Sequence, residues 1–333
     1  MRVIHRSSER EAESIAVQPT KKIWFDGVFV PWEDAKVHVL THALHYGYAI
    51  FEGIRANSTP KGPAVFRLRE HIKRLMSGTK TYRMKIPFTE EELVQGCLDL
   101  VKVNGLNECY IRPIVFSSYG EMGVNPLKNK ISAAISAWEW GAYLGDEGME
   151  KGIRCTISSW ARIDPRTLPP HAKCSANYAN SILAKMDALS AGFDEAILLT
   201  TNGLVAEGTG ENIFRIKDGV LSTPTKSAGV LEGITRDSVI QIAKDNGIQF
   251  KEEDFIREDI FSADEIFLCG TAANVTPIRE VDNRIIGNGS FPITRKIQEA
   301  YLNAIHGKTA KYESWLSYAS LPPIYNRPAS EKV

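Results

Sequence analysis

The chain has 333 residues, and its 40 basic residues balance 40 acidic ones, so the formal net charge is zero at pH 7. Without a bulk charge it has no field that would attract nucleic acid or an anionic membrane, so we expect small-molecule partners, no nucleic acid and no membrane. Its five cysteines are scattered and odd in number, which argues against a disulfide framework and a structural zinc site and favours a reducing cytoplasm.

The first part of the chain mixes strand and helix patterns. Residues 1–20 are polar and aperiodic, so we expect an N-terminal extension there. A strand pattern from Ile23 to Val30 is interrupted by Asp26-Gly27, a hairpin signal. Hydrophobic spacing predicts further strands over residues 64–68 and 110–116, and helices over residues 71–76 and 90–101. Together these elements predict a small N-terminal domain over residues 21–142.

A stretch with several glycines and no clear periodicity precedes the next strand pattern, so residues 143–150 are interpreted as an interdomain loop. A large C-terminal domain is expected over residues 151–310. Its predicted elements are strands over residues 155–158, 196–200 and 265–268, helices over residues 178–189 and 235–244, and a hairpin over residues 213–221. Several hairpins and few βαβ repeats indicate an α+β fold whose second sheet is strongly curved. Residues 311–333 are rich in proline and are expected to form a tail.

Lys173 is the strongest candidate for a catalytic residue. Pro169 and Pro170 stiffen the approach to it, and Cys174 and Ser175 leave space around the amine. A lysine shielded from water loses basicity, and its neutral amine can attack a carbonyl to form a Schiff base. The alternative is an ordinary surface lysine, which is the commoner case for a lysine taken without its context.

Glu207 lies in a turn punctuated by glycines, in the run Glu207-Gly208-Thr209-Gly210-Glu211-Asn212. A carboxylate there could pair with a protonated pyridine nitrogen and keep the ring electron-poor. Lys173, the phenol of Tyr178 and this carboxylate are the parts that an enzyme needs to bind and use pyridoxal phosphate. On local pattern alone, Glu207 and Glu211 could equally be loop carboxylates that decorate a turn.

Two turns could hold a phosphate. The run from Leu231 through Gly233 to Thr235 is a glycine turn that opens into a helical pattern, where free backbone N–H groups and the positive helix end suit an anion. Gly270-Thr271-Ala272-Ala273 follows a strand and could offer further amides. An ordinary capped helix start is the commoner explanation of the first turn.

Tyr110 and Arg112 alternate on one predicted strand and therefore share a face. A guanidinium beside a phenol could hold a carboxylate, although a surface salt bridge would use the same residue types. Aromatic residues that could line an apolar pocket, or simply belong to the core, are Tyr46, Phe51, Trp140 and Tyr143. His38, His42 and His45 have helical spacing but no acidic or cysteine partner nearby, so we expect no metal site.

Several motifs follow one another along the chain in a characteristic order. They are His42-Ala43-Leu44-His45-Tyr46-Gly47, Phe51-Glu52-Gly53-Ile54-Arg55, Tyr110-Ile111-Arg112-Pro113, Met122-Gly123-Val124-Asn125-Pro126, Glu207-Gly208-Thr209-Gly210-Glu211-Asn212, Gly233-Ile234-Thr235-Arg236 and Gly270-Thr271-Ala272-Ala273. From about Lys22 to about Gly307 the chain resembles the class IV aminotransferases of fold type IV, and within them the branched-chain amino acid aminotransferases. The resemblance implies a smaller N-terminal α/β sandwich domain and a larger C-terminal pseudo-barrel domain.

The resemblance also implies pyridoxal 5'-phosphate as the cofactor. Lys173 would be the Schiff-base lysine, Tyr178 would hydrogen-bond the ring hydroxylate, and Glu207 would hold the pyridinium. The phosphate would be bound by Arg74, Ile234, Thr235 and Thr271, and Leu231, Gly233 and Gly270 would complete the cofactor-binding set. We expect no metal ion in this site.

The implied reaction is transamination of leucine, isoleucine or valine with 2-oxoglutarate by a ping-pong mechanism, giving branched 2-oxo acids and L-glutamate. Tyr110 and the Thr271-Ala272 turn would take the α-carboxylate, and Arg112 would take the distal carboxylate. The other substrate-binding residues would be Tyr46, Phe51, Gly53, Val124, Trp140 and Tyr143. In this family a loop of the neighbouring subunit completes the site, so we expect a homodimer or higher homo-oligomer in which residues 122–124 cross the interface.

Some positions depart from the family pattern. Tyr48 and Ala49 stand where smaller or hydroxylic residues are usual, and Cys174-Ser175-Ala176 replaces a more glycine-rich run, so the substrate range could differ. Cys174 would make the site sensitive to oxidation if its thiolate were accessible. The alternatives are a D-amino acid or (R)-amine aminotransferase or an aminodeoxychorismate lyase of the same fold, and a binding protein without turnover. A nicotinamide dehydrogenase is disfavoured, because no Gly-x-Gly-x-x-Gly links a strand to a helix.

Overall fold

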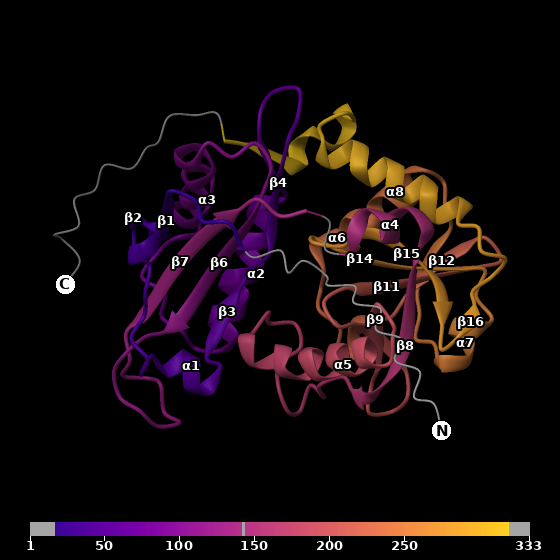
Figure 1. Ribbon diagram of the computed structural model, residues 1–333, viewed down its shortest axis with the longest axis horizontal. Coiled ribbons are helices and arrows are strands. Elements are labelled where there is room, and N and C mark those ends of the chain that lie inside the picture. The colour runs from indigo at the N-terminus through magenta and orange to yellow at the C-terminus, as the bar shows by residue number, and fades with distance from the viewer. Residues whose placement is uncertain (1–16, 142–143, 320–333) are drawn as a thin grey trace, which may run out of the picture.

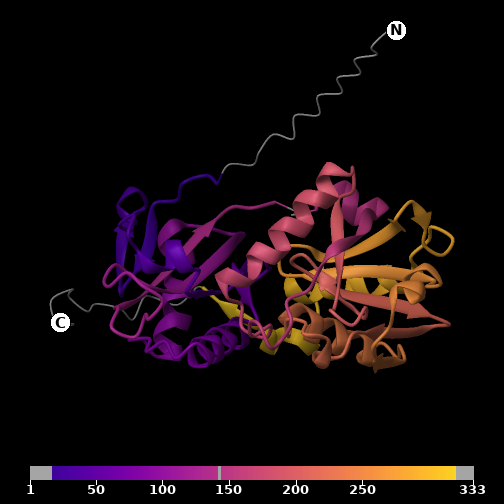
Figure 2. The ribbon, with the colours of Figure 1, turned by 90° about the horizontal axis from the view of Figure 1, so that it is seen from below.

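The structure, a computed structural model, describes residues 17–141 and 144–319 and shows two lobes that lie side by side (Figures 1 and 2). In the described residues the first lobe is built on an eight-stranded sheet in the order β17-β5-β4-β6-β7-β1-β2, with β3 paired to β6. Its strands are β1 (Lys22–Phe25), β2 (Val28–Pro31), β3 (Ala49–Phe51), β4 (Ile54–Asn57), β5 (Ala64–Phe66), β6 (Cys109–Ser117), β7 (Ile131–Trp138) and β17 (Leu316–Tyr318). Its helices are α1 (His42–Tyr46), α2 (Leu68–Thr81) and α3 (Glu90–Asn104).

Local signals in the first lobe set the hairpin at Asp26-Gly27 and the helix over residues 90–101, both of which the sequence predicted. The hairpin between β1 and β2 turns at Asp26 and Gly27, whose φ angles of 45° and 95° lie in the left-handed region. Helix α3 begins with a capping box, in which Thr89 and Glu92 bond each other's backbone N–H groups. Its apolar face packs on β1, β6 and β7 and closes the core of this lobe.

The second lobe is built on a sheet that closes on itself. In the described chain nine strands follow the order β10-β9-β8-β15-β14-β11-β12-β13, with β16 paired to β15, and β10 also pairs with β11. The path from β10 to β11 therefore forms a closed, barrel-like ring. The strands are β8 (Ile153–Ala161), β9 (Glu195–Leu199), β10 (Val205–Gly208), β11 (Asn212–Lys217), β12 (Val220–Thr223), β13 (Phe250–Glu252), β14 (Glu265–Gly270), β15 (Asn274–Val281) and β16 (Arg284–Ile285).

Helices surround this ring. They are α4 (Gly145–Lys151), α5 (Tyr178–Ser190), α6 (Ile234–Asp245), α7 (Arg257–Phe261) and α8 (Pro292–Ile305). Helices α6 and α8 pack together over β14 and share a core with Phe214 and Phe267, whose rings stack at 4.9 Å. Within the described residues, no helix is long and apolar enough to cross a membrane.

Two sequence-based expectations differ from the structure. The expected interdomain loop, residues 143–150, contains most of α4, which packs on β15 and is held by the Arg295 guanidinium through the carbonyls of Met149 and Glu150. The glycines of α4 interrupt the hydrophobic period that would identify a helix in the sequence, so the helix is recognised only from these tertiary contacts. The expected tail begins too early, because residues 311–319 include β17, which pairs with β5 and buries Leu316. The division into domains stays a prediction.

The lobes meet along the segment that carries Lys173. The backbone N–H of Phe51, at the end of β3, donates to the Lys173 carbonyl at 3.0 Å, and Ile50 forms a β-bridge with Cys174. Helix α5 follows this segment and lies between the lobes in both views (Figures 1 and 2). The site is therefore assembled at the seam between the two sheets.

Candidate active site

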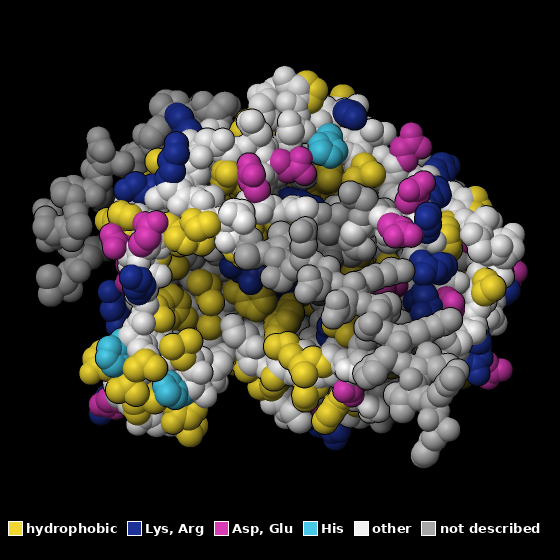
Figure 3. All heavy atoms as spheres, viewed as in Figure 1, with side chains coloured by type: hydrophobic (Ala, Val, Ile, Leu, Met, Phe, Trp, Pro, Cys, Tyr) yellow, Lys and Arg dark blue, Asp and Glu magenta, His cyan; other side chains and the backbone are white. Residues whose placement is uncertain are grey.

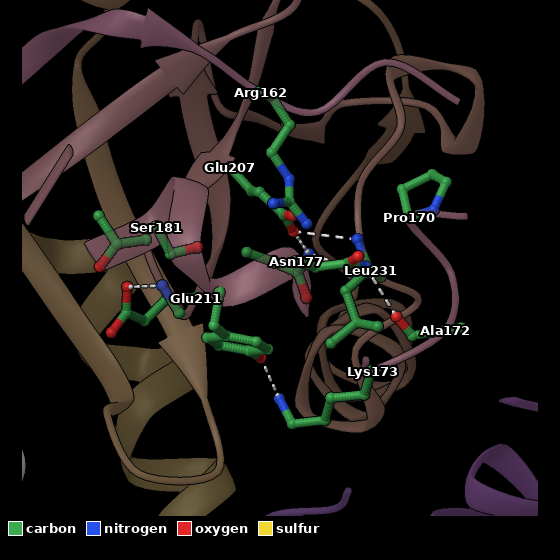
Figure 4. A pocket seen from close by; sticks show the side chains of 13 residues that line it. Arg162, Pro170, Ala172, Lys173, Asn177, Ser181, Glu207, Glu211 and Leu231 are labelled. Carbon is green, nitrogen blue, oxygen red and sulfur yellow. Dashed lines mark hydrogen bonds and ion pairs between the residues drawn. The ribbon is translucent and has the colours of Figure 1, made fainter. Parts of the chain in front are cut away.

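Lys173 and Tyr178 line the same pocket, and Figure 4 shows the Lys173 side chain in it. The Lys173 Nζ donates to the Tyr178 hydroxyl at 2.7 Å, and it lies 5.2 Å from the centroid of the Phe51 ring. The loop that carries Lys173 is fixed by Asn177, whose side-chain amide donates to the Pro169 and Ala172 carbonyls, each at 3.1 Å. The amine is thus held at a defined position in a pocket, as expected of a reactive lysine rather than a surface one.

Glu207 lies on β10 at another wall of the same pocket and is 5% exposed. Its Oε1 forms an ion pair with the Arg162 Nε at 2.7 Å, and Arg162 is also buried. Its Oε2 accepts from the Leu231 backbone N–H at 3.0 Å and from the Asn212 side-chain amide at 3.2 Å (Figure 4). These contacts fix the carboxylate and place a permanent positive charge beside it, so Glu207 is not a loop carboxylate exposed to solvent.

The predicted phosphate turn forms the start of α6. Gly233 is the N-cap, and Ile234 and Thr235 open the helix, where backbone N–H groups lack partners within the helix and suit an anion. A Cβ on Gly233 would lie 2.0 Å from the Asn212 Oδ1, so any larger residue at this position would clash with the Asn212 side chain. The guanidinium of Arg74, on α2 in the other lobe, donates to the Glu232 carbonyl at 2.8 Å. Two segments distant in sequence therefore meet at the helix start.

The second predicted anion turn lies between β14 and β15. Gly270 is the last residue of β14, and Thr271 and Ala272 form the turn. Thr271 lines a small cavity together with His71 of α2. The turn thus approaches the same region between α2 and the second sheet as the Arg74 side chain.

Tyr110 and Arg112 share one face of β6, as their alternation predicts. The Arg112 guanidinium lies 4.9 Å from the Phe51 ring centroid and 5.2 Å from that of Tyr110. Its Nε is buried and has no hydrogen-bond partner within residues 17–141 and 144–319. Because Phe51 also faces Lys173, a partly buried cation with a buried, unused Nε donor among the described residues lies one aromatic ring away from the amine.

Aromatic rings and a glycine shape the space around Arg112. The Trp140 ring stands edge-on to Tyr110 at 4.7 Å, and Trp138 pairs directly with Tyr110 across β6 and β7. The carbonyl of Trp140 accepts from Arg55 of the Phe51–Arg55 motif. A Cβ on Gly53 would lie 2.0 Å from the Tyr110 hydroxyl, which explains the glycine there.

Tyr46 and Val124 lie apart from this pocket. Tyr46 is 44% exposed at the end of α1, and Val124 is 86% exposed. His42 contacts both segments. Its ring centroid lies 4.6 Å from that of Tyr46, and its Nε2 bonds the carbonyl of Gly123, the residue before Val124, at 2.8 Å. Among the described residues, neither lines the pocket around Lys173. Tyr143 lies outside the described residues.

Several residues at the site were missed by sequence reasoning, namely Glu52, Arg162, Asn177, Asn212 and Trp138. Arg162 follows directly after β8 and reaches Glu207 only because β8 and β9 pair in parallel beside β10. No local pattern marks such a residue. Asn212 and Glu52 do lie inside motifs that the sequence singled out, and their place in those motifs was the signal available.

The predicted sensitivity of Cys174 to oxidation is not supported. Its side chain is fully buried, and its Sγ points to the Gly47 carbonyl at 3.6 Å. A thiol without access to solvent reacts slowly with oxidants, since the thiolate is the reactive form and needs access. The cysteine beside Lys173 therefore serves packing between the lobes.

Glu211 gives the pocket a carboxyl group that titrates in an unusual range. Burial, and then the charge of Glu195, raise the pKa of Glu211 from 4.5 to about 8, although Lys185 and the Gly210 N–H act in the opposite direction. The charge of Glu207 raises it further. An acid whose pKa is raised on folding binds more protons in the folded chain, so stability falls as pH rises between about 4.5 and about 8.

Glu211→Gln is therefore expected to remove a pH-dependent loss of stability. Glutamine is neutral throughout, so the variant should gain roughly 1 kcal/mol relative to the parent chain for each pH unit of this window. Unfolding followed at pH 5.5, 7.0 and 8.5 for both chains would measure the difference. A difference in stability that stays constant across the three pH values would contradict the raised pKa.

Comparisons with known proteins agree with this geometry. The family described as amino-transferase class IV matches residues 49–281. The branched-chain-amino-acid aminotransferase of Escherichia coli K12 is 46% identical over 302 residues, which are 89% of this chain and 98% of that protein. The crystal structure of the T.th. branched-chain amino acid aminotransferase complexed with N-(5'-phosphopyridoxyl)-L-glutamate superposes with a TM-score of 0.87 at 48% identity, covering 91% of this chain and 100% of that one.

The same T.th. enzyme was solved in complex with 4-methylvaleric acid, and that structure superposes with a TM-score of 0.86 at 48% identity, again covering 91% of this chain and 100% of that one. At this level of identity the likeness extends to the whole described fold. The predicted two-lobed α+β architecture with a barrel-like second sheet is confirmed.

Proposed function

We propose the function of this chain from one premise, which is that it belongs to the class IV aminotransferases. It transfers the amino group of leucine, isoleucine or valine to 2-oxoglutarate and gives branched 2-oxo acids and L-glutamate, with pyridoxal 5'-phosphate as its cofactor. The observation that carries the substrate assignment is Arg112, a guanidinium whose buried Nε has no partner among the described residues and which shares the Phe51 ring with Lys173. The two ligands of the T.th. enzyme, one with the acidic side chain of glutamate and one with a branched aliphatic chain, support a pocket of this dual character.

The donor set of the pocket fits the cofactor. Lys173 provides an amine for covalent attachment to the aldehyde, and the Tyr178 hydroxyl, 2.7 Å from that amine, can donate to the ring hydroxylate. Glu207, held by Arg162 and the Leu231 N–H, can bind the ring nitrogen. When bound, pyridoxal phosphate supplies an electron sink for the pair released as the substrate Cα loses its proton.

The phosphate has complementary partners at the seam. The N–H groups of Ile234 and Thr235 and the Thr235 hydroxyl lie at the positive end of α6, and Arg74 reaches the same turn from α2. Thr271 approaches from the turn after β14 and can add a hydroxyl. Leu231, Gly233 and Gly270 contribute the backbone that brings these groups together.

Proton transfer is the task of Lys173. With the cofactor bound, the free Nζ would remove the Cα proton of the substrate and would later return a proton, acting first as base and then as acid. Its contacts keep the amine close to where it is needed, between the Phe51 ring and the Tyr178 hydroxyl. The second half-reaction repeats these steps in reverse with 2-oxoglutarate, so ping-pong kinetics are expected.

One pocket accepts two kinds of side chain. Tyr110 and the Thr271-Ala272 turn bind the α-carboxylate that all substrates share, and Phe51 and Trp140 offer apolar surface to a branched side chain. Arg112 binds the distal carboxylate of glutamate or 2-oxoglutarate, since a guanidinium with spare donors suits a carboxylate. A donor panel against 2-oxoglutarate, with L-leucine, D-leucine and an (R)-amine, tests the assignment, and turnover confined to the D-amino acid or the amine would contradict it.

Arg112→Ala is expected to weaken glutamate far more than leucine. Removing the partner of a desolvated carboxylate should lower kcat/KM for glutamate by about 10²-fold, whereas leucine loses only packing against the aromatic rings, about fivefold or less. Steady-state kinetics with both donors measure the two values, and Arg166→Ala, whose side chain is 88% exposed, serves as control. Equal losses for the two donors would mean that the distal carboxylate is bound elsewhere.

A homodimer or larger homo-oligomer completes the site. Apolar side chains gather on the hollowed face between the lobes (Figure 3), and the exposed ones there and on α5 are Val37, Val39, Leu40, Leu44, Ile182, Leu183, Met186 and Leu189. Tyr46 and Val124 are exposed on the first lobe and, among the described residues, do not line the pocket around Lys173, which supports a role of residues 122–124 in the site of the neighbouring subunit. A monomer should be inactive.

Five free, buried cysteines support a cytoplasmic location.

A further inference from the structure

Glu52 has no role in the function proposed above, although it lies in one of the motifs that the sequence singles out. It occupies the turn between β3 and β4 and is completely buried. Its Oε1 accepts from the Arg74 Nε at 2.7 Å, and its Oε2 accepts from the Arg74 Nη2 at 2.9 Å. The carboxylate and the guanidinium therefore meet edge to edge through two parallel hydrogen bonds, the geometry that fixes an arginine most firmly.

These bonds determine which donors of Arg74 remain for a ligand. A guanidinium has five N–H groups. Glu52 takes one on Nε and one on Nη2, and the Glu232 carbonyl takes one on Nη1 at 2.8 Å. Within the part of the chain that the structure describes, one N–H on Nη1 and one on Nη2 are left. Arg74 is thus held from one side by the first lobe and from another by the turn that leads into α6, with two donors free.

A third buried residue fixes the carboxylate itself. The His71 Nδ1, one turn before Arg74 on α2, lies 2.8 Å from the Glu52 Oε2, and the Gly53 backbone N–H donates to the same oxygen at 3.2 Å. Burial lowers the pKa of His71 below its usual value of 6.5, so its ring is neutral at pH 7. Burial alone would raise the pKa of Glu52, but Arg74 and His71 lower it well below its usual range. An ionised carboxylate only accepts, so the His71 proton resides on Nδ1.

We propose that Glu52 is the positioning residue for the cofactor phosphate, which it serves by fixing the Arg74 guanidinium with two donors directed away from itself. This inference rests on the proposed function, since it assumes that Arg74 binds the phosphate. A negative charge beside a phosphate site opposes phosphate binding, so Glu52 gives no electrostatic benefit to the ligand. What it offers is orientation, in the same way that groups behind a metal ligand orient that ligand.

The test compares two ligands that differ only in the phosphate. The full-length chain, freed of cofactor, is titrated with pyridoxal phosphate and with pyridoxal, and the ratio of the two dissociation constants is taken. In Glu52→Gln the amide presents an N–H to a guanidinium N–H, so the pair no longer fits. The preference for pyridoxal phosphate is expected to fall by about tenfold or more through weaker binding of that ligand, while binding of pyridoxal changes by about twofold or less.

Two further variants separate orientation from charge and from folding. Glu52→Asp keeps the charge but is one methylene too short to reach both nitrogens, so the preference should fall here too. Glu265→Gln is the matched control, because Glu265 is also buried and its carboxylate accepts from the Ile293 and Thr294 N–H groups at the start of α8. This control should lose stability and keep the preference.

The outcomes distinguish this inference from the function on which it rests. If Arg74→Ala lowers the preference and Glu52→Gln leaves it unchanged, the role of Glu52 is refuted and the phosphate assignment of Arg74 stands. If Arg74→Ala leaves the preference unchanged, both the assignment of Arg74 and the role of Glu52 are wrong. If Glu52→Gln fails to fold, Arg74→Lys replaces it as the test, because an ammonium cannot bond both carboxylate oxygens of Glu52 at once. An unchanged preference for pyridoxal phosphate in Arg74→Lys overturns the proposal.

Discussion

Lys173→Ala is expected to leave a folded chain with almost no transaminase activity. The lysine amine has two tasks, attachment of the cofactor and transfer of the Cα proton, and alanine can perform neither. Turnover should therefore fall by about 10⁴-fold or more. The fold should survive, because the side chain lies in the pocket with its amine bonded to Tyr178, whereas the segment is held by backbone bonds and by Asn177.

The measurement is the rate of 2-oxo acid formation from leucine, with thermal unfolding of both chains as a test of folding. Lys217→Ala is a suitable control, since Lys217 is a half-exposed lysine paired with Asp264 at the end of β11. Addition of an exogenous amine such as methylamine should restore part of the activity of Lys173→Ala. Residual turnover within about a hundredfold of the parent chain, without added amine, would reject the role of Lys173.

Glu207→Gln is expected to retain the cofactor and to slow the chemical step by about 10²- to 10³-fold. A neutral amide cannot balance a protonated ring nitrogen, so the ring loses much of its capacity to accept electrons. The substitution also leaves Arg162 buried without its anionic partner, which should reduce stability. Single-turnover rates at saturating leucine separate the chemical step from binding.

A matched control for Glu207→Gln is again Glu265→Gln, which removes a buried carboxylate distant from the pocket. It should lower stability without slowing the chemical step. Equal single-turnover rates in Glu207→Gln and the parent chain would remove the electron-sink argument, even if the cofactor were bound more weakly.

Local sequence signals predicted much of the fold. The hairpin at Asp26-Gly27 and the helices that begin at Glu90 and Ile234 carry their own turn residues and caps, so short windows suffice to find them. Closure of the second sheet is different, because the pairing of β15 with β8 depends on contacts between distant segments, as does the joining of β17 to β5 in the first sheet. The helix α4 was missed for the same reason, since its contacts to β15 outweigh a glycine-rich sequence.

The site divides in the same way. Lys173, Tyr178 and Glu207 were predicted because each stands in a distinctive local context, and the structure brings them to one pocket. Arg162 was not predicted, because a buried ion pair between distant segments leaves no trace in spacing along the chain. Glu52 lies in a motif that the sequence singled out, but its pairing with Arg74 depends on the tertiary fold. Both hold a predicted residue in place, Arg162 at Glu207 and Glu52 at Arg74. Sequence patterns thus predicted the reacting groups more readily than the groups that orient them.

The most direct test of the account is chemical trapping of the cofactor. The cofactor-loaded chain is reduced with borohydride, digested, and mapped by mass spectrometry. We expect a phosphopyridoxyl group on Lys173, in the peptide that contains Pro169-Pro170-His171-Ala172-Lys173, and its absence when leucine is added in excess before reduction. A chain that carries no such group, or carries it on another lysine, would contradict the central claim.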